Sequence, residues 1–593
     1  MVNPPARTWR LLPHDRPKVE QLARALQLPP LVAQLLLNRG VSAPDQARRF
    51  LDAPIGGLHP PRLLPGLDDA VERITRAVET RQRICVYGDY DVDGVTGSAI
   101  LLQMLRLLGA KPDLYLPHRL TEGYGLNREA LRQIAANGNQ LVITVDCGIA
   151  SLAEAEEARR LGLQLIITDH HEMKAELPAA DVLVHPRLPG SGYPFGGLCG
   201  AGVALKLAWG LAMRKCGGEK VTEIYREALL EAVGLAALGV IADVVPLQDE
   251  NRILVRYGLE RLARRPPAGV LALCEAAQLD PTALRAGDIG YKIAPRINAV
   301  GRLGQAEVAV ELLTTGRRER AVDLARHLER LNADRQKLER ETVQRARQLI
   351  ESERRENDPA LILASGDWHG GIVGIVAGRL AEQYGRPALM VTLPKSADED
   401  GEHARLATGS GRSVAGVALH EALTACGDLL VGHGGHEAAA GFRLLPENLP
   451  AFRERFCAYV AGRFPDGLPA PQLELDAEAP LGALTIGLLG DLDRLEPYGA
   501  KNRRPLFLAG GLQVEGEPRK VGQGERHLSF RVRQGAVTLK AIGWNMADRL
   551  PELLSAGGAC CLAVTPKRNE WNGRVSVDLE VADFQPGLEA RLA

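Results

Sequence analysis

The sequence predicts an α/β protein that ends in a small β-barrel, and two patterns of apolar residues predict this fold class. Between residues 66 and 465, short continuous apolar runs alternate with helical stretches, as in parallel sheets that helices cover on both faces. Beyond residue 472, β-type runs dominate, which favours a barrel. The chain has 593 residues, too many for one hydrophobic core, so we expect several domains.

The chain is expected to begin with an N-terminal extension over residues 1–65, rich in proline, leucine and arginine, with a helical patch from Lys18 to Asn38. Residues 66–316 follow as the first α/β domain. Its expected strands are short apolar runs between helical patterns. They are Ile84–Tyr87, Leu141–Val145, Leu163–Ile167 and Val182–Val184, with Val240–Ala242 as a further run of the same kind.

A long polar helix over residues 317–356 is expected to connect this domain to the next. It carries one narrow leucine stripe on a charged rod, which is typical of an interdomain connector. A second α/β domain over residues 357–465 begins with the expected strand Ala360–Ala364. A linker rich in proline and glycine then leads to the barrel, which is expected over residues 472–586.

Composition limits the classes of function. The formal net charge is −1, so any binding of nucleic acid must come from a local basic patch. The nine cysteines include no Cys-x-x-Cys pair, which fits a reducing compartment and argues against a zinc ribbon or a disulfide framework. The most apolar segment, Ala232–Ala242, is too short to span a bilayer. We therefore expect a cytoplasmic protein without membrane contact.

Acidic residues follow four of the apolar runs. They are Asp89, Asp91 and Asp93 after Ile84–Tyr87, Asp146 after Leu141–Val145, Asp169-His170-His171 after Leu163–Ile167, and Asp243 after Val240–Ala242. In an open parallel sheet the carboxyl ends of the strands meet at the edge where ligands bind. We therefore expect these side chains to converge at one edge.

So many carboxylates at one edge repel one another unless a cation neutralises them. Oxygen-rich sites with an imidazole suit Mn²⁺ or Mg²⁺, and two such ions about 3.5–4 Å apart promote in-line phosphoryl displacement. A single aspartate at a strand end often only caps the next helix, and Asp89 could serve its turn alone. The whole set, with its tandem histidines, favours a metal-dependent phosphodiesterase.

A series of motifs runs through the chain. The motifs are Tyr87–Gly94, Arg119–Gly125, Asp169–His171, Gly200–Ala204, Ala242–Pro246, Pro295–Arg302, Trp368–Gly370, Gly432–His436, Glu496–Gly499 and Asn569–Gly573. Their order resembles the DHH phosphoesterase superfamily, named for the tripeptide found here at residues 169–171. Within it, they resemble the RecJ family of bacterial single-strand-specific DNA exonucleases.

The resemblance implies that the three domains are a DHH domain, a DHHA1 domain and an oligonucleotide-binding (OB) barrel. It implies a 5′→3′ exonuclease that degrades single-stranded DNA to mononucleotides by two-metal-ion phosphodiester hydrolysis, in DNA repair and recombination. The residues implied to hold two Mn²⁺ or Mg²⁺ ions are Asp91, Asp93, Asp146, His170 and Asp243. His171 is implied to face the scissile phosphate, with Asp89 and Asp169 as further catalytic residues.

A second set of residues is expected to bind the strand. Gly409–Ser413 offers backbone donors, hydroxyls and a guanidinium in what we expect to be a tight loop, a composition that suits a terminal phosphate. By resemblance, the residues that contact DNA or its 5′ phosphate are Arg119, Arg296, Asn298, Arg302, His369, Ser410, Arg412, His433 and His436. In the barrel, the expected strand contacts are Lys567, Arg568 and Trp571, while Phe507, His527, Phe530 and Trp544 either stack on bases or form core.

Single-stranded DNA is the expected partner, single-strand-binding protein and a helicase are family expectations, and the chain is expected to act as a monomer. Three other interpretations stay open. His369, His433 and His436 offer a zinc site, although no cysteine lies nearby. The chain could also be a DHH hydrolase of small nucleotides, which needs neither the barrel nor the connector. The chain could finally be a non-catalytic scaffold that binds single strands. Such a scaffold does not need its acidic residues, whereas here all of them are intact.

Overall fold

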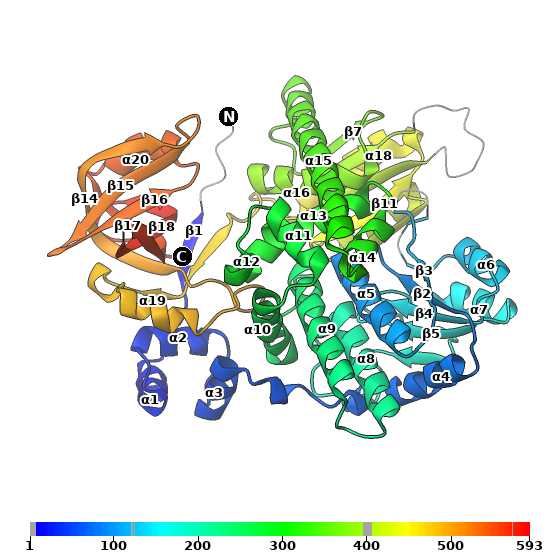
Figure 1. The fold of residues 1–593 in the computed structure, drawn as a ribbon. Coiled ribbons are helices and arrows are strands. Elements are labelled where there is room, and N and C mark those ends of the chain that lie inside the picture. Colours follow the sequence, from blue (N-terminus) through cyan, green and yellow to red (C-terminus); the bar gives the residue numbers. More distant parts are fainter. Residues whose placement is uncertain (1–6, 120–121, 124, 395–405, 572) are drawn as a thin grey trace.

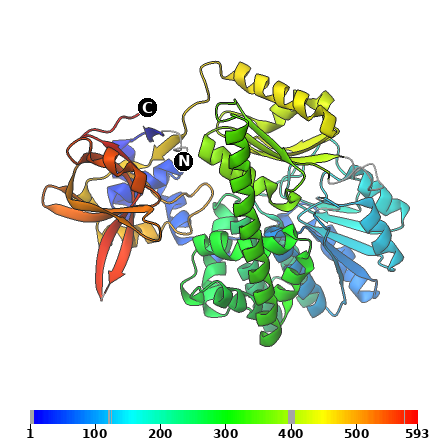
Figure 2. The ribbon, with the colours of Figure 1, turned by 90° about the horizontal axis from the view of Figure 1, so that it is seen from above.

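The computed structural model describes residues 7–119, 122–123, 125–394, 406–571 and 573–593 (Figure 1, Figure 2). The two α/β domains lie together, and the barrel forms a separate lobe with the N-terminal helices, at the left of both views. The connector helix α15 (Arg318–Ser352) packs on α11, α13 and α14 of the first domain and on α16 of the second. No helix in the described part of the chain has both the length and the apolar character needed to cross a membrane.

The first domain is built on a fully parallel sheet in the order β3-β2-β4-β5-β6. Its strands are β2 (Ile84–Gly88), β3 (Asp113–Tyr115), β4 (Leu141–Val145), β5 (Gln164–Thr168) and β6 (Val182–Val184). The predicted apolar runs of this sheet are thereby confirmed. The chain passes from β2 to β3 on one side and then to β4 on the other, so the strand order reverses between β2 and β4 and leaves a crevice at their carboxyl ends.

Helices cover both faces of this sheet. Successive strand residues point to opposite sides, so each strand contributes apolar side chains to the core on each face. The helices are α4 (Leu67–Glu79), α5 (Val92–Leu107), α6 (Arg128–Ala136), α7 (Leu152–Arg160) and α8 (Gly200–Cys216). Val86 and Ile143 share a core with α4, α5 and α8. Cys85 and Val142, their neighbours in sequence, share the opposite core with α6 and α7.

A group of helices extends the first domain toward the barrel lobe (Figure 1). They are α9 (Glu223–Ala242), α10 (Asp249–Arg264), α11 (Ala268–Ala276), α12 (Ala286–Asp288), α13 (Ala294–Arg302) and α14 (Ala306–Thr314), with a π-helical turn at Ile289–Ile293. The prediction that Val240–Ala242 forms a strand is wrong, because these residues are the last turn of α9. Helices α5, α8 and α10 surround α9, so its C-terminal half is apolar on all sides and shows no helical periodicity.

The second α/β domain holds a mixed sheet in the order β10-β11-β9-β8-β7, in which only β7 and β8 are parallel. Its elements are β7 (Leu361–Ser365), α16 (Gly370–Tyr384), β8 (Ala388–Thr392), β9 (Ala407–Arg412), α17 (Leu419–Thr424), β10 (Gly432–Gly435), β11 (Ala439–Leu444) and α18 (Leu449–Arg463). Helix α16 packs between the sheet and α15, and Phe452 and Phe456 of α18 fill the core on the other face.

The expected tight loop at Gly409–Ser413 is wrong, because Ala407–Arg412 form strand β9, paired with β8 and β11 on its two sides. Glycine and serine favour turns, so the sequence misleads here. Gly409 lies under the ring of Phe442, where an added Cβ would meet the ring at 2.1 Å. The strand therefore needs a glycine for packing rather than for a turn.

The barrel closes through an additional pairing of β14 with β17 in the sheet order β13-β14-β15-β16-β18-β17. Its elements are β13 (Ala477–Glu478), α19 (Ile486–Asp493), β14 (Phe507–Val521), β15 (His527–Gln534), β16 (Val537–Gly543), α20 (Leu550–Leu554), β17 (Ala559–Trp571) and β18 (Arg574–Pro586). Phe507 and Phe530 are buried in its core, which confirms the core alternative for these two rings.

The N-terminal segment packs on the barrel. Its elements are β1 (Thr8–Leu11), α1 (Arg16–Leu26), α2 (Pro30–Asn38) and α3 (Pro44–Asp52). Strand β1 pairs in parallel with β12 (Gln472–Leu475), and buried Trp9 donates a hydrogen bond from Nε1 to Asp583 of β18 at 2.8 Å. Leu35 and Leu36 of α2 belong to the same core as the barrel. The extension is thus an integral part of the barrel lobe.

One buried arginine joins the barrel lobe to the first domain. Arg252 of α10 is 2% exposed and donates to the carbonyl oxygens of Phe50 at 2.6 Å, Leu495 at 2.9 Å, Glu496 at 2.9 Å and Arg494 at 3.2 Å. Its guanidinium lies 3.9 Å from the centroid of the Phe50 ring. Burial lowers the pKa of Arg252 to about 9. We call these contacts the Arg252 joint.

Replacing Arg252 with methionine should lower the free energy of unfolding by about 3 kcal/mol or more, because several buried carbonyl groups lose their donor at once. Urea unfolding followed by tryptophan fluorescence measures the change. Arg16→Met is the matched control, because the Arg16 side chain is 83% exposed. Equal midpoints for the two variants would contradict the joint.

Candidate active site

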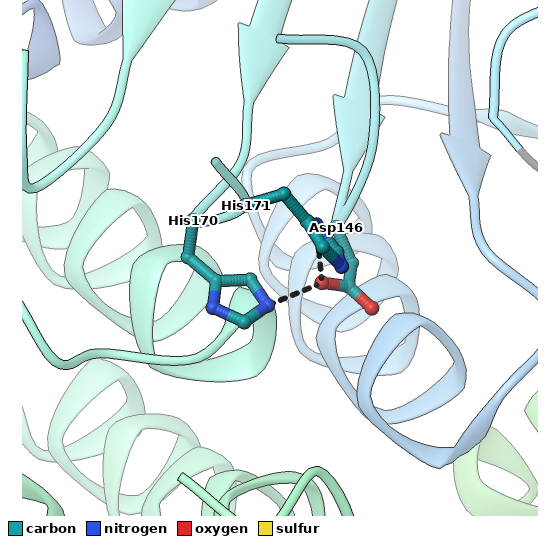
Figure 3. Close-up of side chains that lie close together, drawn as sticks. All are labelled: Asp146, His170 and His171. Carbon is teal, nitrogen blue, oxygen red and sulfur yellow. Dashed lines mark ion pairs between the residues drawn. The ribbon is translucent and has the colours of Figure 1, made fainter. Parts of the chain in front are cut away.

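The acids predicted at strand ends converge at the crevice between β2 and β4. Figure 3 shows one of them, Asp146, with His170 and His171. His170 Nε2 lies 3.1 Å from Asp146 Oδ1, 3.6 Å from Asp243 Oδ2 and 3.8 Å from Asp93 Oδ2. Ligand atoms lie within 4.8 Å of one another in three overlapping groups. These groups are Asp93, His170 and Asp243; Asp89, Asp91 and Asp146; and Asp146, His170 and His171. The groups overlap at Asp146 and at His170, so one continuous set of ligand atoms is available to divalent cations.

Backbone donors hold two of these carboxylates. Asp91 caps α5, and its Oδ1 accepts hydrogen bonds from the backbone N–H groups of Asp93 at 2.8 Å and Gly94 at 3.1 Å. Asp93 accepts from the N–H groups of Gly200 at 2.6 Å and Ala201 at 2.9 Å, at the start of α8. The N-termini of α5 and α8 therefore place partial positive charge on the acids.

Two glycines let helices approach the carboxylates. A Cβ at Gly200 of α8 would lie 2.5 Å from Asp146 Oδ1, and one at Gly239 of α9 would lie 2.4 Å from Asp93 Oδ1. Asp243 caps the C-terminus of α9 and reaches the site from this helix instead of from a strand end. The sequence analysis missed Gly239, which lies in an apolar run and gives no signal of its own.

Burial and mutual repulsion raise the pKa of three of these acids in the metal-free protein. Burial, followed by the neighbouring aspartates, raises the pKa of Asp146 and Asp89 well above the usual range and that of Asp243 to about 8. Burial lowers the pKa of His170 to about 4, so its imidazole is neutral. Asp89 Oδ1 is buried without a hydrogen-bond partner among the described residues. Carboxylate oxygens with one neutral imidazole are a donor set that fits Mn²⁺ or Mg²⁺.

His171 is held by Asp169. Its Nδ1 lies 2.7 Å from Asp169 Oδ1, which also accepts from the N–H group of His170 at 2.7 Å, while Asp169 Oδ2 accepts from Ile149 N at 2.9 Å. Although burial opposes both charges, this hydrogen bond lowers the pKa of Asp169 to about 2 and raises that of His171 to about 9. The pair presents a charged imidazolium whose side chain is 36% exposed.

Two further residues, missed in the sequence analysis, position the DHH tripeptide. His185 Nδ1 accepts from the N–H group of Arg187 at 3.0 Å, so its Nε2 carries the proton and donates to His171 O at 2.9 Å. Arg187 donates to His170 O at 2.6 Å. His185 follows β6 directly, so the strand-end pattern that selected the aspartates also marks this histidine.

A cluster of arginines lies next to the acidic site. Arg302 of α13 donates to Gly371 O of α16 at 2.9 Å, and burial together with the charges of Arg119, Arg335 and Arg412 lowers its pKa to about 10. Burial and the charge of Arg119 likewise lower the pKa of Arg412. The positive charges of these arginines repel one another, and a bound anion would relieve that repulsion.

Two other predicted residues, Ser410 and His369, lie at the start of α16 next to these arginines. At Gly374 of α16, an added Cβ would meet Ser410 Oγ at 2.9 Å and Arg412 Nη2 at 3.5 Å, so both side chains reach the first turns of that helix. His369 is the N-cap of α16, and its Nδ1 accepts from Gly371 N at 3.1 Å. The guanidinium of Arg119 lies 4.9 Å from the centroid of the Tyr90 ring.

The other predicted strand contacts are less directly placed. Arg296 of α13 forms an ion pair with Glu329 of α15 and does not share the partners of Arg302. Asn298 is half-buried. His433 lies exposed on β10. The hydrogen bond and ion pair with Arg187 lower the pKa of the Glu172 carboxyl, and the nearby His436 adds to this effect. His436 of the second domain thus faces the segment that follows the DHH tripeptide.

In the barrel, Lys567 pairs with Glu580 at 2.5 Å and Arg568 is exposed. Trp544 is 51% exposed, with the His527 ring 4.8 Å away. The side chain of Trp571 lies outside the described part of the structure, as do Leu120, Thr121, Tyr124 and Asn572 of the predicted motifs.

Comparison with known proteins assigns the family. Sequence models of the DHH family N-terminal domain, the DHHA1 domain and the RecJ OB domain match residues 83–239, 357–462 and 475–583. The single-stranded-DNA-specific exonuclease RecJ of Bacillus subtilis is 36% identical over 97% of this chain and 70% of its own length. RecJ of Escherichia coli is 35% identical over 94% of this chain and 96% of its own length. The chain belongs to the RecJ family.

Solved structures of RecJ share the fold. The crystal structure of RecJ from Thermus thermophilus in complex with Mn²⁺ matches with a TM-score of 0.82 and 34% identity, over 99% of this chain and 80% of that one. The Mg²⁺ complex of the same protein matches with a TM-score of 0.76 and 32% identity, over 99% and 79% of the two chains. The fold class and the DHH, DHHA1 and OB assignments are thus confirmed.

Mn²⁺ should raise the melting temperature of this RecJ-family chain, and raise it more at about pH 8.5 than at about pH 6, because a binding cation must displace protons. In the metal-free protein the pKa of Asp243 is raised, so its ionisation costs stability as pH rises from the ordinary value through about 8. A bound cation removes that cost.

Differential scanning fluorimetry with and without Mn²⁺ measures this effect. Asp146→Asn should abolish the shift, whereas Asp113→Asn, on the edge strand β3 of the same sheet, should keep it. A shift of equal size at both pH values would contradict the assignment of these acids to a cation.

Proposed function

We propose that this RecJ-family chain is a metal-dependent exonuclease that hydrolyses single-stranded DNA from its 5′ end. The observation that carries the proposal is the adjacency of an acidic metal site and an arginine pocket. Tyr90 separates the two, since Asp89 and Asp91 flank it in sequence and Arg119 packs on its ring. The relatives named single-stranded-DNA-specific exonucleases support the substrate class.

The residues of the acidic site have distinct parts in this reaction. Asp91, Asp93, Asp146, His170 and Asp243 would hold Mn²⁺ or Mg²⁺, and Asp89, grouped with Asp91 and Asp146, offers a further carboxylate. A bound cation would supply Lewis-acid stabilisation of the phosphoryl charge and promote attack by water. His171, kept charged by Asp169, donates a hydrogen bond to a phosphoryl oxygen as negative charge builds on it. His185 and Arg187 keep the tripeptide backbone in place.

The arginine pocket sets the polarity and the size of the product. Arg302, Arg412 and Ser410, with the N-terminus of α16, offer fork-shaped and backbone donors to a terminal phosphate. Because Arg119 packs on Tyr90, whose neighbours in sequence are Asp89 and Asp91, a terminal phosphate in the pocket brings the bond next to it close to the acids. This favours release of mononucleotides in the 5′→3′ direction.

The cellular setting follows from this activity. A 5′ exonuclease for single strands serves DNA repair and recombination, with a helicase to supply the strand and single-strand-binding protein to cover it. One chain supplies all residues of the proposed site, which supports action as a monomer. The nine free cysteines, most of them buried, support a reducing compartment such as the cytoplasm.

Two substitutions should separate metal binding from chemistry. Asp146→Asn should lose both activity and the Mn²⁺-induced rise in melting temperature. His171→Ala should keep that rise and lose about 10²–10³ in kcat, the range for removing one donor to a developing anion. Release of mononucleotide from a 5′-labelled single strand measures activity. Activity at the wild-type level in either variant would contradict the proposed site.

Arg412→Ala should lower kcat/KM for a 5′-phosphorylated strand by about 10- to 100-fold, the loss expected for one charge-assisted hydrogen bond. A strand with a 5′ hydroxyl should be affected much less, because it lacks the group that Arg412 binds. Arg455→Ala is the matched control, since Arg455 lies on α18 and forms an ion pair with Asp428. An equal loss on both strands would contradict a pocket for the terminal phosphate.

A further inference from the structure

A cleft of about 810 Å³ lies between the first domain and the linker that leads into the barrel. One wall is formed by the end of α9 and the π-helical turn at Ile289–Ile293, and the other by residues 493–504. Ala242 and Val244 line it, and these residues flank Asp243 in sequence. The cleft therefore reaches the backbone on both sides of Asp243 and extends from there to the linker of the barrel.

Two apolar side chains on the first wall are unusually exposed. Tyr291 is 87% exposed, although its turn is fixed by Ile289 and Ile293, both fully buried. Val244 is 68% exposed and has φ +59, a backbone conformation that β-branched residues avoid. A buried anchor beneath Tyr291 and a strained backbone beneath Val244 present both side chains to the cleft instead of to a core.

The opposite wall is rich in arginine. Arg494, Arg503 and Arg504 line it together with Asp493 and Glu496, and the guanidinium of Arg504 lies 5.6 Å from the centroid of the Tyr498 ring. Arg503 forms an ion pair with Glu474 at 2.8 Å. Arg503 and Arg504 also line a second cleft, of about 620 Å³, bounded by the barrel and the second α/β domain. The positive charge thus continues beyond the first cleft.

This combination selects one occupant. An exposed aromatic ring that faces guanidinium groups is an arrangement that binds single strands without regard to sequence, because bases stack on the ring and phosphates meet the arginines. A folded protein partner would instead need a contact that buries about 1,200–2,000 Å² of surface in total, which a concave cleft lined by few exposed side chains does not offer. The cleft lies beside Asp243, and Arg302, Ser410 and Arg412 of the arginine pocket do not line it. This position fits the part of the strand that lies 3′ of the cleaved bond.

We propose that Tyr291, with Val244 beside it, forms a platform on which a base of the single strand stacks, 3′ of the bond to be cleaved. The platform holds the strand in register as each mononucleotide leaves, so it acts on binding and positioning rather than on the chemical step. This inference rests on the proposed exonuclease function.

Tyr291→Ala should reduce kcat/KM for a long single strand by about 5- to 100-fold, the range for losing one base stack on an aromatic ring. Hydrolysis of a 5′-phosphorylated dinucleotide, which is too short to reach along the cleft, should be unchanged. Tyr291→Phe should keep most of the activity, because the ring remains. Ile224→Ala, which removes another exposed apolar side chain at the start of α9, is the matched control.

Single strands with one abasic residue at successive positions locate the contact. With the wild-type protein, the rate should fall most for an abasic residue at one position near the 5′ end, and in Tyr291→Ala this position-specific fall should disappear. The inference is overturned if Tyr291→Ala degrades long strands at the wild-type rate, or if the abasic profile is the same in both proteins. Failure of the wild-type protein to degrade any single strand would instead overturn the proposed function.

Discussion

Mutual repulsion among the acids at the crevice between β2 and β4 is the constraint around which the first domain is arranged. Five aspartates and His170 meet there with little access to solvent. The N–H groups at the start of α5 and α8 compensate part of the charge. The rest must be neutralised by protons or by a cation, so the folded protein is prepared for a cation at the expense of its own stability.

The strand ends and their acids could be predicted because a parallel sheet gives a strong pattern, in which short apolar runs stop at a polar residue. The approach of Asp243 from a helix could not be predicted. Helix α9 is surrounded by other helices, and an all-apolar segment has no periodicity to distinguish a helix from a strand. Gly239 could not be predicted either, because it has no side chain to form a pattern. Its role is to leave space for the carboxylate of Asp93.

Two arginines of α13 show a second limit. Arg302 and Arg296 belong to one motif, yet Arg302 contacts Gly371 of the second domain and Arg296 pairs with Glu329 of the connector. Their partners lie far away in sequence, and only the packing of α15 against α13 decides which guanidinium remains near the acids. Residue type and motif therefore predicted that arginines would bind a phosphate. Which of the two arginines lies in the pocket depended on tertiary contacts.

The pairing of β1 with β12 joins two segments that lie far apart in sequence into one lobe. Trp9 and the apolar faces of α1 to α3 need the barrel, which begins about 460 residues later, to complete their core. At about 5–20 residues per second, the ribosome takes roughly 20–90 seconds to deliver it. During synthesis this segment thus emerges long before the barrel that buries it. It stays available to chaperones and proteases until both α/β domains have been made.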